Sequence, residues 1–296
     1  MSHRQKIVIL DFGSQTSQLI ARRVRENHVY SELLPPDVSA KSLTNDDVRG
    51  IILSGGPASV AAADSPRCDP AIFELGVPIL GICYGMQLMG ESFGGVVEAG
   101  QTREFGRTKI DIRAAESILA RLPEQLHVWM SHGDLVSRVS DDFEILAASD
   151  HCPVAAVRHR SKPLFGVQFH PEVTHTQHGS TIIRNFVYEV CGCTGDWKVD
   201  NVVDEAVAKV RRQVGGEDRV ICGLSGGVDS SVVAALIHQA IGNRLVCIFV
   251  DNGLLRQNER DVVESTFRDH FGMELHVIDA ASRFLRALQR VTDPQE

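Results

Sequence analysis

Short apolar runs alternate with amphipathic helical patterns along most of the chain. Apolar runs at 7–12, 50–56 and 77–82 predict buried strands, and the patterns at 15–26 and 84–93 predict helices after the first and last of them. Strands that alternate with helices favour a mainly parallel sheet covered on both faces. The pattern therefore predicts an α/β fold.

The alternation of predicted strands and helices ends between about residues 96 and 169. The segments TKIDIRA, HVWMSH, EILAAS and LFGVQFH predict strands with few helices between them. We expect these to be later strands of the same domain, some of them antiparallel, so that its sheet is mixed. A helix from about His178 to Val190 is expected to close the domain.

The stretch 191–201 has no periodicity and is rich in turn-forming residues, which marks a boundary. We expect one domain over 1–195 and a second over 196–296. Helical patterns at 202–214, 229–241 and 259–271 alternate there with the strand-like segments RVICGL, NRLVCIFVD and MELHVID. Three strands make a thin α/β sheet, so this second α/β domain is expected to be incomplete, as if the chain were cut off.

Composition narrows the possible functions. A net charge of −8 over 296 residues argues against a nucleic-acid binder. The seven cysteines have no framework spacing, and Cys222 and Cys247 lie within apolar runs, which indicates buried thiols in a reducing compartment. The first apolar run is too short for a signal peptide or a membrane span. The cytoplasm is the expected location.

The sharpest local signal is Gly81-Ile82-Cys83-Tyr84-Gly85, a nucleophile flanked by glycines between a predicted strand and a predicted helix. The glycines permit a tight turn that strains the backbone of the nucleophile. A helix N-terminus at Cys83 would favour the thiolate, and the N–H of Tyr84 is suited to holding an oxyanion. A buried cysteine in a glycine-rich turn is an equally good interpretation of this motif alone.

The motif Phe169-His170-Pro171-Glu172 favours the interpretation of Cys83 as a nucleophile over that of a buried structural cysteine. His170 has the chemistry of a base for a thiol, and Glu172 can orient its imidazole across the restrained proline. If Cys83 were absent, His170 would be interpreted as a histidine at the end of a strand that makes a local hydrogen bond. Gly55 and Gly56, after the strand residues IIL at 51–53, allow close backbone approach to a ligand, and the Gly56 N–H is a second oxyanion candidate. A simple turn is as plausible there.

GICYGMQ around Cys83, HPE at 170–172, SGGP at 54–57 and WMSHGD at 129–134 together resemble the class I glutamine amidotransferases, over about residues 5–190. The resemblance implies that Cys83 attacks the side-chain amide of glutamine, with His170 as general base and acid and Glu172 orienting it. It implies an oxyanion hole from the N–H groups of Gly56 and Tyr84. Gln87 and Ser131, His132, Gly133 and Asp134 would help hold glutamine.

Ser225, Gly226, Gly227, Val228, Asp229, Ser230 and Ser231 lie between a predicted strand and a predicted helix. A glycine-rich turn that opens a helix is suited to binding anions, although a capped helix is the alternative. The motif lacks Gly-Lys-Ser/Thr, so it is not a Walker A loop. It resembles the pyrophosphate loop of the ATP pyrophosphatases, in an adenine nucleotide α-hydrolase-like domain. That resemblance implies an ATP site that includes Asp251, and Mg²⁺ at Asp229.

The order of the two modules resembles the glutamine-dependent ligases that aminate ATP-activated xanthosine monophosphate (XMP). It implies glutamine, ATP with Mg²⁺, and XMP as substrates, no tightly bound organic cofactor, and no nucleic acid or membrane as partner. It also implies homodimerisation of the longer parent through a further C-terminal domain, and that this chain alone lacks the synthetase step. A stand-alone glutaminase subunit and a non-catalytic fragment are the alternatives.

Overall fold

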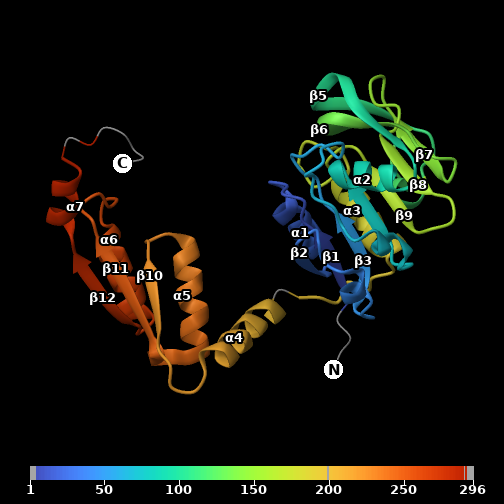
Figure 1. The fold of residues 1–296 in the computed structure, drawn as a ribbon. Helices are drawn as coiled ribbons and strands as arrows, with labels where there is room; N and C mark the ends of the chain where they lie inside the picture. Colours follow the sequence, from blue (N-terminus) through green and yellow to red (C-terminus); the bar gives the residue numbers. More distant parts are fainter. Residues whose placement is uncertain (1–4, 199, 290, 292–296) are drawn as a thin grey trace. The chain divides into compact units, whose positions relative to one another are not determined.

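The computed structural model describes residues 5–198, 200–289 and 291. The chain divides into two compact units, Met1–Trp197 and Lys198–Glu296. Each unit is an α/β structure with a sheet of its own (Figure 1).

The first unit contains a nine-stranded sheet in the order β2-β1-β3-β4-β9-β8-β7-β5-β6. The strands from β2 to β9 in this order are parallel, and the remaining pairings are antiparallel, which confirms the predicted mixed sheet. The bounds are β1 Lys6–Leu10, β2 Tyr30–Leu34, β3 Val48–Leu53, β4 Ile79–Ile82, β5 Val96–Ile112, β6 Gln125–Arg138, β7 Phe143–Ala148, β8 Ala156–His159 and β9 Leu164–Val167.

Helices cover this sheet on both faces. Ile7 and Ile9 of β1 belong to one hydrophobic cluster, and Val8 and Leu10, which point the other way, belong to a second. Both faces of a parallel sheet need such cover. The helices are α1 Ser17–Glu26, α2 Tyr84–Ser92 and α3 Gly179–Asn185, which continues as a π-helical turn over Phe186–Val190. Short 3₁₀ turns lie at Ala40–Leu43, Pro70–Glu74 and Ser117–Leu119.

Several strands differ from the sequence expectation. The strands β2 and β8 were not predicted, because β2 is a half-polar edge strand and β8 is only four residues long. The strands β5 and β6 are much longer than the patterns that indicated them, and they pair along most of their length. This long hairpin extends beyond the parallel part of the sheet (Figure 1).

The second unit contains the parallel sheet β10-β11-β12, with bounds Val220–Leu224, Leu245–Asp251 and Glu274–Asp279. Its helices are α4 Asp200–Val214, α5 Val228–Ile241, α6 Glu259–Glu264 with a π-helical turn at Ser265–His270, and α7 Ala281–Ala287; a 3₁₀ turn spans Gly242–Arg244. Helix α7 was not predicted.

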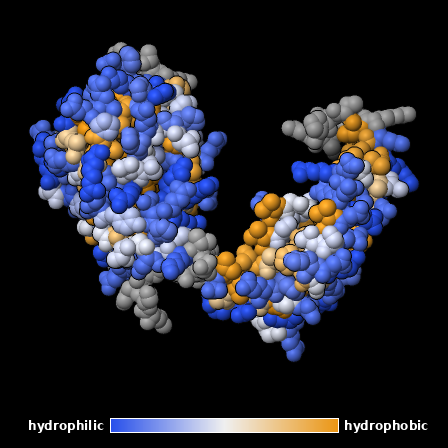
Figure 2. Space-filling view, turned by 180° about the vertical axis from the view of Figure 1, so that it is seen from behind, coloured by the Kyte–Doolittle hydropathy of each residue, from blue (hydrophilic) through white to orange (hydrophobic). Residues whose placement is uncertain are grey.

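One face of this three-stranded sheet is covered and the other is open. Cys222 and Cys247 are paired in register on the covered face, and both are buried, as the sequence predicts. Ile221, Val250 and Ile278 alternate with the buried positions and are 70%, 40% and 47% exposed. Figure 2 shows hydrophobic side chains gathered on the surface of this unit. All seven cysteines are free thiols.

Over the described residues, no helix combines the length and the apolar character that a membrane span requires.

The buried side chain of Asn185 tests the packing of α3 in the first unit. Its amide donates to the carbonyl oxygens of Ile118 and Ala120, at 3.1 and 2.9 Å. Replacing Asn185 with alanine leaves both carbonyls without a donor, so we expect a loss of about 1–3 kcal/mol in the free energy of unfolding. Both tryptophans of the chain, Trp129 and Trp197, lie in this unit, so denaturant unfolding followed by tryptophan fluorescence measures its stability.

Gln18→Ala is the matched control, because Gln18 is exposed on α1 and the substitution should change stability by no more than about 0.5 kcal/mol. Equal midpoints for the Asn185→Ala and Gln18→Ala variants would contradict the structural role of Asn185.

Candidate active site

Cys83 lies in the sharp turn between β4 and α2 with a strained backbone, at φ 51° and ψ −105°. Its N–H donates to the carbonyl oxygen of Val167 at 2.8 Å, which holds the turn against β9. A β-carbon on Gly81 would lie 2.7 Å from the carbonyl carbon of Gly85, and one on Gly85 would clash with the carbonyl oxygen of Leu53. Both glycines of the motif are therefore required by the close approach of α2 to the sheet.

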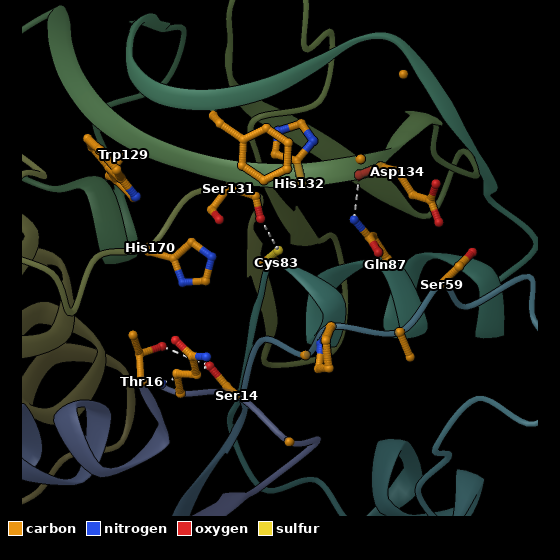
Figure 3. A pocket seen from close by; sticks show the side chains of 18 of the residues that line it. Ser14, Thr16, Ser59, Cys83, Gln87, Trp129, Ser131, His132, Asp134 and His170 are labelled. Atoms are coloured by element: carbon orange, nitrogen blue, oxygen red, sulfur yellow. Dashed lines mark hydrogen bonds between the residues drawn. The ribbon is translucent and has the colours of Figure 1, made fainter. Parts of the chain in front are cut away.

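Sheet topology brings His170 to Cys83. The strands β4 and β9 are parallel neighbours with Ile82 opposite Val167, so Cys83 and the segment that contains His170 leave the sheet at the same edge. Figure 3 shows the imidazole of His170 beside the sulfur of Cys83. His170 Nδ1 lies 2.8 Å from Glu172 Oε1, and this leaves Nε2 for the thiol. The three predicted catalytic side chains thus lie together in the structure.

The environment of His170 favours its protonated form. Burial opposes the imidazolium, but the interactions with Cys83 and Glu172 outweigh burial and raise the pKa of His170 to about 10. Glu172 is completely buried, and its Oε1 also accepts a hydrogen bond from Thr16 Oγ1 at 2.7 Å. An imidazolium next to a thiol is the arrangement that activates cysteine nucleophiles.

The loop that contains His170 is fastened to β6. The His170 N–H donates to the carbonyl oxygen of Trp129 at 3.0 Å, and Thr176 Oγ1 donates to the carbonyl oxygen of His170 at 2.6 Å. The N–H of Trp129 donates to the same Thr176 hydroxyl at 3.0 Å. The base is therefore held by the antiparallel part of the sheet, independently of the helix that follows the nucleophile.

A cavity of about 670 Å³ opens in front of Cys83 and His170. Gly56 lines it, and Tyr84 is the first residue of α2. Among the described residues, no group accepts a hydrogen bond from the backbone N–H of either residue, although Tyr84 is buried and does not itself line the cavity. A β-carbon on Gly56 would lie 2.7 Å from the carbonyl oxygen of Phe12, so this close approach requires glycine.

Segment 131–134 of β6 forms the wall of the cavity opposite the helix. The Cys83 thiol lies 3.8 Å from the carbonyl oxygen of Ser131. Gln87 Nε2 donates to the carbonyl oxygen of Asp134 at 2.6 Å, so this amide supports the wall (Figure 3). His132 is buried, and Gly133 lines the cavity. The predicted glutamine-binding residues are thus brought together around the cavity.

Sequence reasoning missed several residues of this site. Gln168, completely buried, donates from Nε2 to the sulfur of Cys83 at 3.7 Å. Loop 13–16 and Trp129 also line the cavity. The loop follows β1, and ligands bind at the carboxyl ends of parallel strands, so its position after an apolar run was a usable signal. Trp129 begins the motif WMSHGD, which was also a usable signal, whereas no comparable signal marks Gln168.

In the second unit, the predicted phosphate loop joins β10 to α5. Gly226 has φ 74°, and α5 begins at Val228, directly after Gly227. Ser230 Oγ accepts from the N–H of Ser225 at 3.1 Å and donates to the carbonyl oxygen of Gly227 at 3.2 Å. Ser231 Oγ also donates to the Gly227 carbonyl oxygen, at 2.8 Å. The serine hydroxyls therefore hold the loop open at the helix N-terminus.

Carboxylates surround this loop. Asp229 is exposed in the first turn of α5. Asp251 ends β11, where its Oδ1 accepts from the N–H of Gly253 at 2.9 Å and its Oδ2 lies 3.6 Å from Arg260. Sequence reasoning missed Glu259, whose carboxylate occupies the space beside Gly226 that a β-carbon would need.

Comparison with protein families agrees with this geometry. The model of the class I glutamine amidotransferases matches residues 8–190, which is more than half of the chain. The chain belongs to the class I glutamine amidotransferase family. Residues 199–296, which follow the amidotransferase region, match the model of NAD synthase.

Curated relatives resemble the chain along nearly its whole length. An enzyme named glutamine-hydrolysing GMP synthase from Paraburkholderia phytofirmans is 53% identical over 98% of this chain and 56% of its own. Enzymes of the same name from Geobacillus kaustophilus and Thermobifida fusca are both 51% identical, over 99% and 98% of this chain. The chain spans a little more than half the length of these relatives, at 54–58%.

Solved structures match the amidotransferase region. A protein from Thermoplasma acidophilum, assigned as one of the subunits of a GMP synthase, is 34% identical, with a TM-score of 0.57, over 65% of this chain and 96% of its own. A glutamine amidotransferase from Thermotoga maritima shares the fold, with a TM-score of 0.52 at 17% identity.

The raised pKa of His170 predicts a pH-dependent contribution to stability. The folded-state pKa of about 10 exceeds the ordinary value of 6.5, so this contribution is fully present below pH 6.5 and is lost as the pH rises to about 10. We expect the difference in unfolding free energy between the wild type and His170→Asn to change in this window, with the wild type losing stability relative to the variant. Urea unfolding at several pH values measures it.

His178→Asn, at an exposed histidine with left-handed backbone, controls for the substitution itself. A wild-type to His170→Asn difference that stays constant from pH 6.5 to 10 would show that His170 is not stabilised as an imidazolium.

Proposed function

We propose that this amidotransferase works as the glutamine-hydrolysing part of a GMP synthase. It hydrolyses glutamine to glutamate and ammonia at Cys83, and the ammonia aminates ATP-activated XMP to GMP, with release of AMP and pyrophosphate. The observation that carries the glutaminase step is the meeting of Cys83, in its strained turn, with His170 and Glu172 in one cavity. The names of the relatives at about 50% identity support the synthase assignment.

The geometry accounts for each step of glutamine hydrolysis. The thiol of Cys83 gives its proton to His170 and the sulfur attacks the amide carbon, so that the amide oxygen becomes an oxyanion held by the N–H groups of Gly56 and Tyr84. His170 gives its proton to the nitrogen as the C–N bond breaks, so that ammonia leaves and a thioester remains. His170 then takes a proton from water, which attacks the thioester and releases glutamate and the thiol. Glu172 holds the imidazole with Nε2 directed at the thiol.

The cavity is suited to a small polar amino acid. Ser131, Gly133 and Asp134 present backbone and side-chain groups along one wall, and Gln87 braces that wall from α2. We assign the glutamine-binding role to these residues together with His132. Its volume of about 670 Å³ lies within the usual range for small-molecule sites.

The second unit is proposed to bind ATP through the loop 225–231 at the N-terminus of α5, with Asp251 beside it. Mg²⁺ is commonly held by one or two carboxylates together with substrate phosphates. The exposed carboxylate of Asp229, which forms no hydrogen bond or ion pair with a described residue, fits such a site. Bound there with ATP, the ion would neutralise phosphate charge. The proposal includes no tightly bound organic cofactor.

We further propose that the enzyme is cytoplasmic and homodimeric. Seven free thiols suit a reducing compartment. The proposed dimerisation rests on the resemblance to the synthase family.

Replacing Cys83 with alanine should abolish release of glutamate from glutamine, because no other group in the cavity can form the thioester. Coupled detection of glutamate and of ammonia measures the activity. Cys68→Ala is the matched control, since Cys68 is also buried, outside the cavity, and we expect it to keep wild-type activity. A glutamine-analogue electrophile should label the wild type and leave the Cys83→Ala variant unmodified. If that variant still hydrolyses glutamine, Cys83 is not the nucleophile.

The phosphate loop makes a separate prediction. Ser230→Ala removes the hydroxyl that joins Ser225 to Gly227, so we expect the affinity for Mg·ATP to fall about tenfold. Isothermal titration of Mg·ATP into the chain measures this affinity. Ser265→Ala, at an exposed serine of the same unit, is the control. Equal affinities for the Ser230→Ala and Ser265→Ala variants would rule out an ATP site at this loop.

A further inference from the structure

A buried cluster of ionisable side chains adjoins the wall of the glutamine cavity: it includes His132, which is also proposed to bind glutamine, and Glu104, which has no role in the proposed reaction. Glu104 of β5 and His132 of β6 are directly paired across the hairpin, and Glu104 Oε2 lies 3.3 Å from His132 Nε2. Their side chains are only 7% and 2% exposed. A possible ligand atom of Cys152 completes the cluster, within 4.8 Å of the other two.

The pair lies beside an interruption of the backbone ladder. Ala99 is opposite Asp134 and Glu104 is opposite His132, so four residues of β5, 100–103, face the single residue Gly133. Regular cross-strand hydrogen bonds cannot fix β6 at such a bulge. Glu104 and His132 are the first residues paired across the two strands on one side of the bulge. Their side-chain contact can therefore hold β6 to β5 where the backbone hydrogen bonds are interrupted.

Glu104 Oε2 and His132 Nε2 face each other at 3.3 Å, but this contact does not itself meet hydrogen-bond geometry. Among the described residues, Glu104 Oε2 and both ring nitrogens of His132 lack a hydrogen bond of good geometry. Burial raises the pKa of Glu104. It also lowers the pKa of His132 to about 4, against a smaller opposing effect of the Asp134 backbone. A single proton between Glu104 Oε2 and His132 Nε2 would satisfy both buried atoms without leaving an unpaired charge.

Other titratable groups near the pair do not change the hydrogen bond assigned to Glu104 and His132. Burial raises the pKa of the Cys152 thiol to about 12, so this neighbour also stays neutral. The other ionisable groups whose charges act on Glu104 or His132 are His151, Asp134 and His170.

The strand that this pair anchors touches the reacting group. Ser131, just before His132, presents its carbonyl oxygen to the Cys83 thiol, and Asp134, two residues after His132, accepts the hydrogen bond from Gln87. Figure 3 shows Ser131, His132 and Asp134 along the same strand above Cys83 and Gln87. A shift of this strand would therefore move the wall against which the substrate lies.

We propose that Glu104 is a positioning residue for the glutamine cavity, whose buried carboxyl group donates a hydrogen bond to His132 and so fixes segment 131–134 opposite Cys83. This inference rests on the proposed glutaminase activity. The pair acts on substrate binding, because it supports the wall and does not contact the reacting atoms.

Two substitutions of similar size separate the hydrogen bond from the shape of the side chain. Glu104→Gln keeps an N–H donor for His132, and we expect a KM for glutamine within about twofold of the wild type. Glu104→Leu keeps the volume and removes the donor, and we expect KM to rise about tenfold with kcat within about threefold. Glu98→Leu, at an exposed position of the same strand, is the control and should behave as the wild type.

Histidine-selective ¹⁵N NMR gives a readout that does not depend on activity. At neutral pH the wild type and Glu104→Gln should show a neutral His132 ring whose Nε2 accepts a hydrogen bond, and Glu104→Leu should lose that signature. The inference is overturned if Glu104→Gln behaves as Glu104→Leu, if Glu104→Leu leaves both KM and the spectrum unchanged, or if the purified wild type holds one equivalent of zinc that Glu104→Leu loses. A wild type that neither hydrolyses glutamine nor becomes labelled at Cys83 refutes the proposed function, and the NMR comparison still decides the hydrogen bond.

Discussion

The strained backbone of Cys83 is the constraint on which the rest of the first unit depends. A residue with a β-carbon at φ 51° and ψ −105° costs about 1–3 kcal/mol, which its surroundings must offset. The offset comes from the bond between the Cys83 N–H and Val167, from the bond between the Gly85 N–H and Ser54, and from the close packing that Gly81 and Gly85 allow. These contacts join β3, β4 and β9, so the order of the parallel strands is itself a condition for the turn.

The two halves of the sheet have different tasks. The parallel half brings Cys83 and the end of β9 to one edge, and so places the nucleophile next to the base. The antiparallel half supplies the anchor for the His170 loop and the wall of the cavity. A displacement of the long hairpin would therefore change both the substrate wall and the base, although neither β5 nor β6 contains a residue of the proposed triad.

Much of this arrangement could be predicted from local sequence. The glycines around Cys83 predicted the turn because only a residue without a β-carbon permits the contact with Leu53. The apolar runs predicted the parallel strands β1, β3, β4 and β9, because both of their faces are buried, and missed only the edge strand β2. The adjacency of β4 and β9 could not be derived from pattern, since it joins residues more than eighty positions apart; the family resemblance implied only that Cys83 and His170 act together. The bulge opposite Gly133 was also hidden, because a bulge depends on strand register, which no single strand reveals.

The second unit contains a turn similar to that at Cys83, between β10 and α5, but with different side chains in it. There too a glycine-rich segment leads from a parallel strand into a helix, but no nucleophile occupies the turn, and its hydroxyls bond to one another and to the Gly227 carbonyl. These hydrogen bonds define the shape of the loop at the N-terminus of α5, where the helix dipole favours an anion. The same arrangement, a strand followed by glycines and a helix, thus holds a cysteine in one unit and a group of serine hydroxyls in the other. The side chains in the turn decide which chemistry follows.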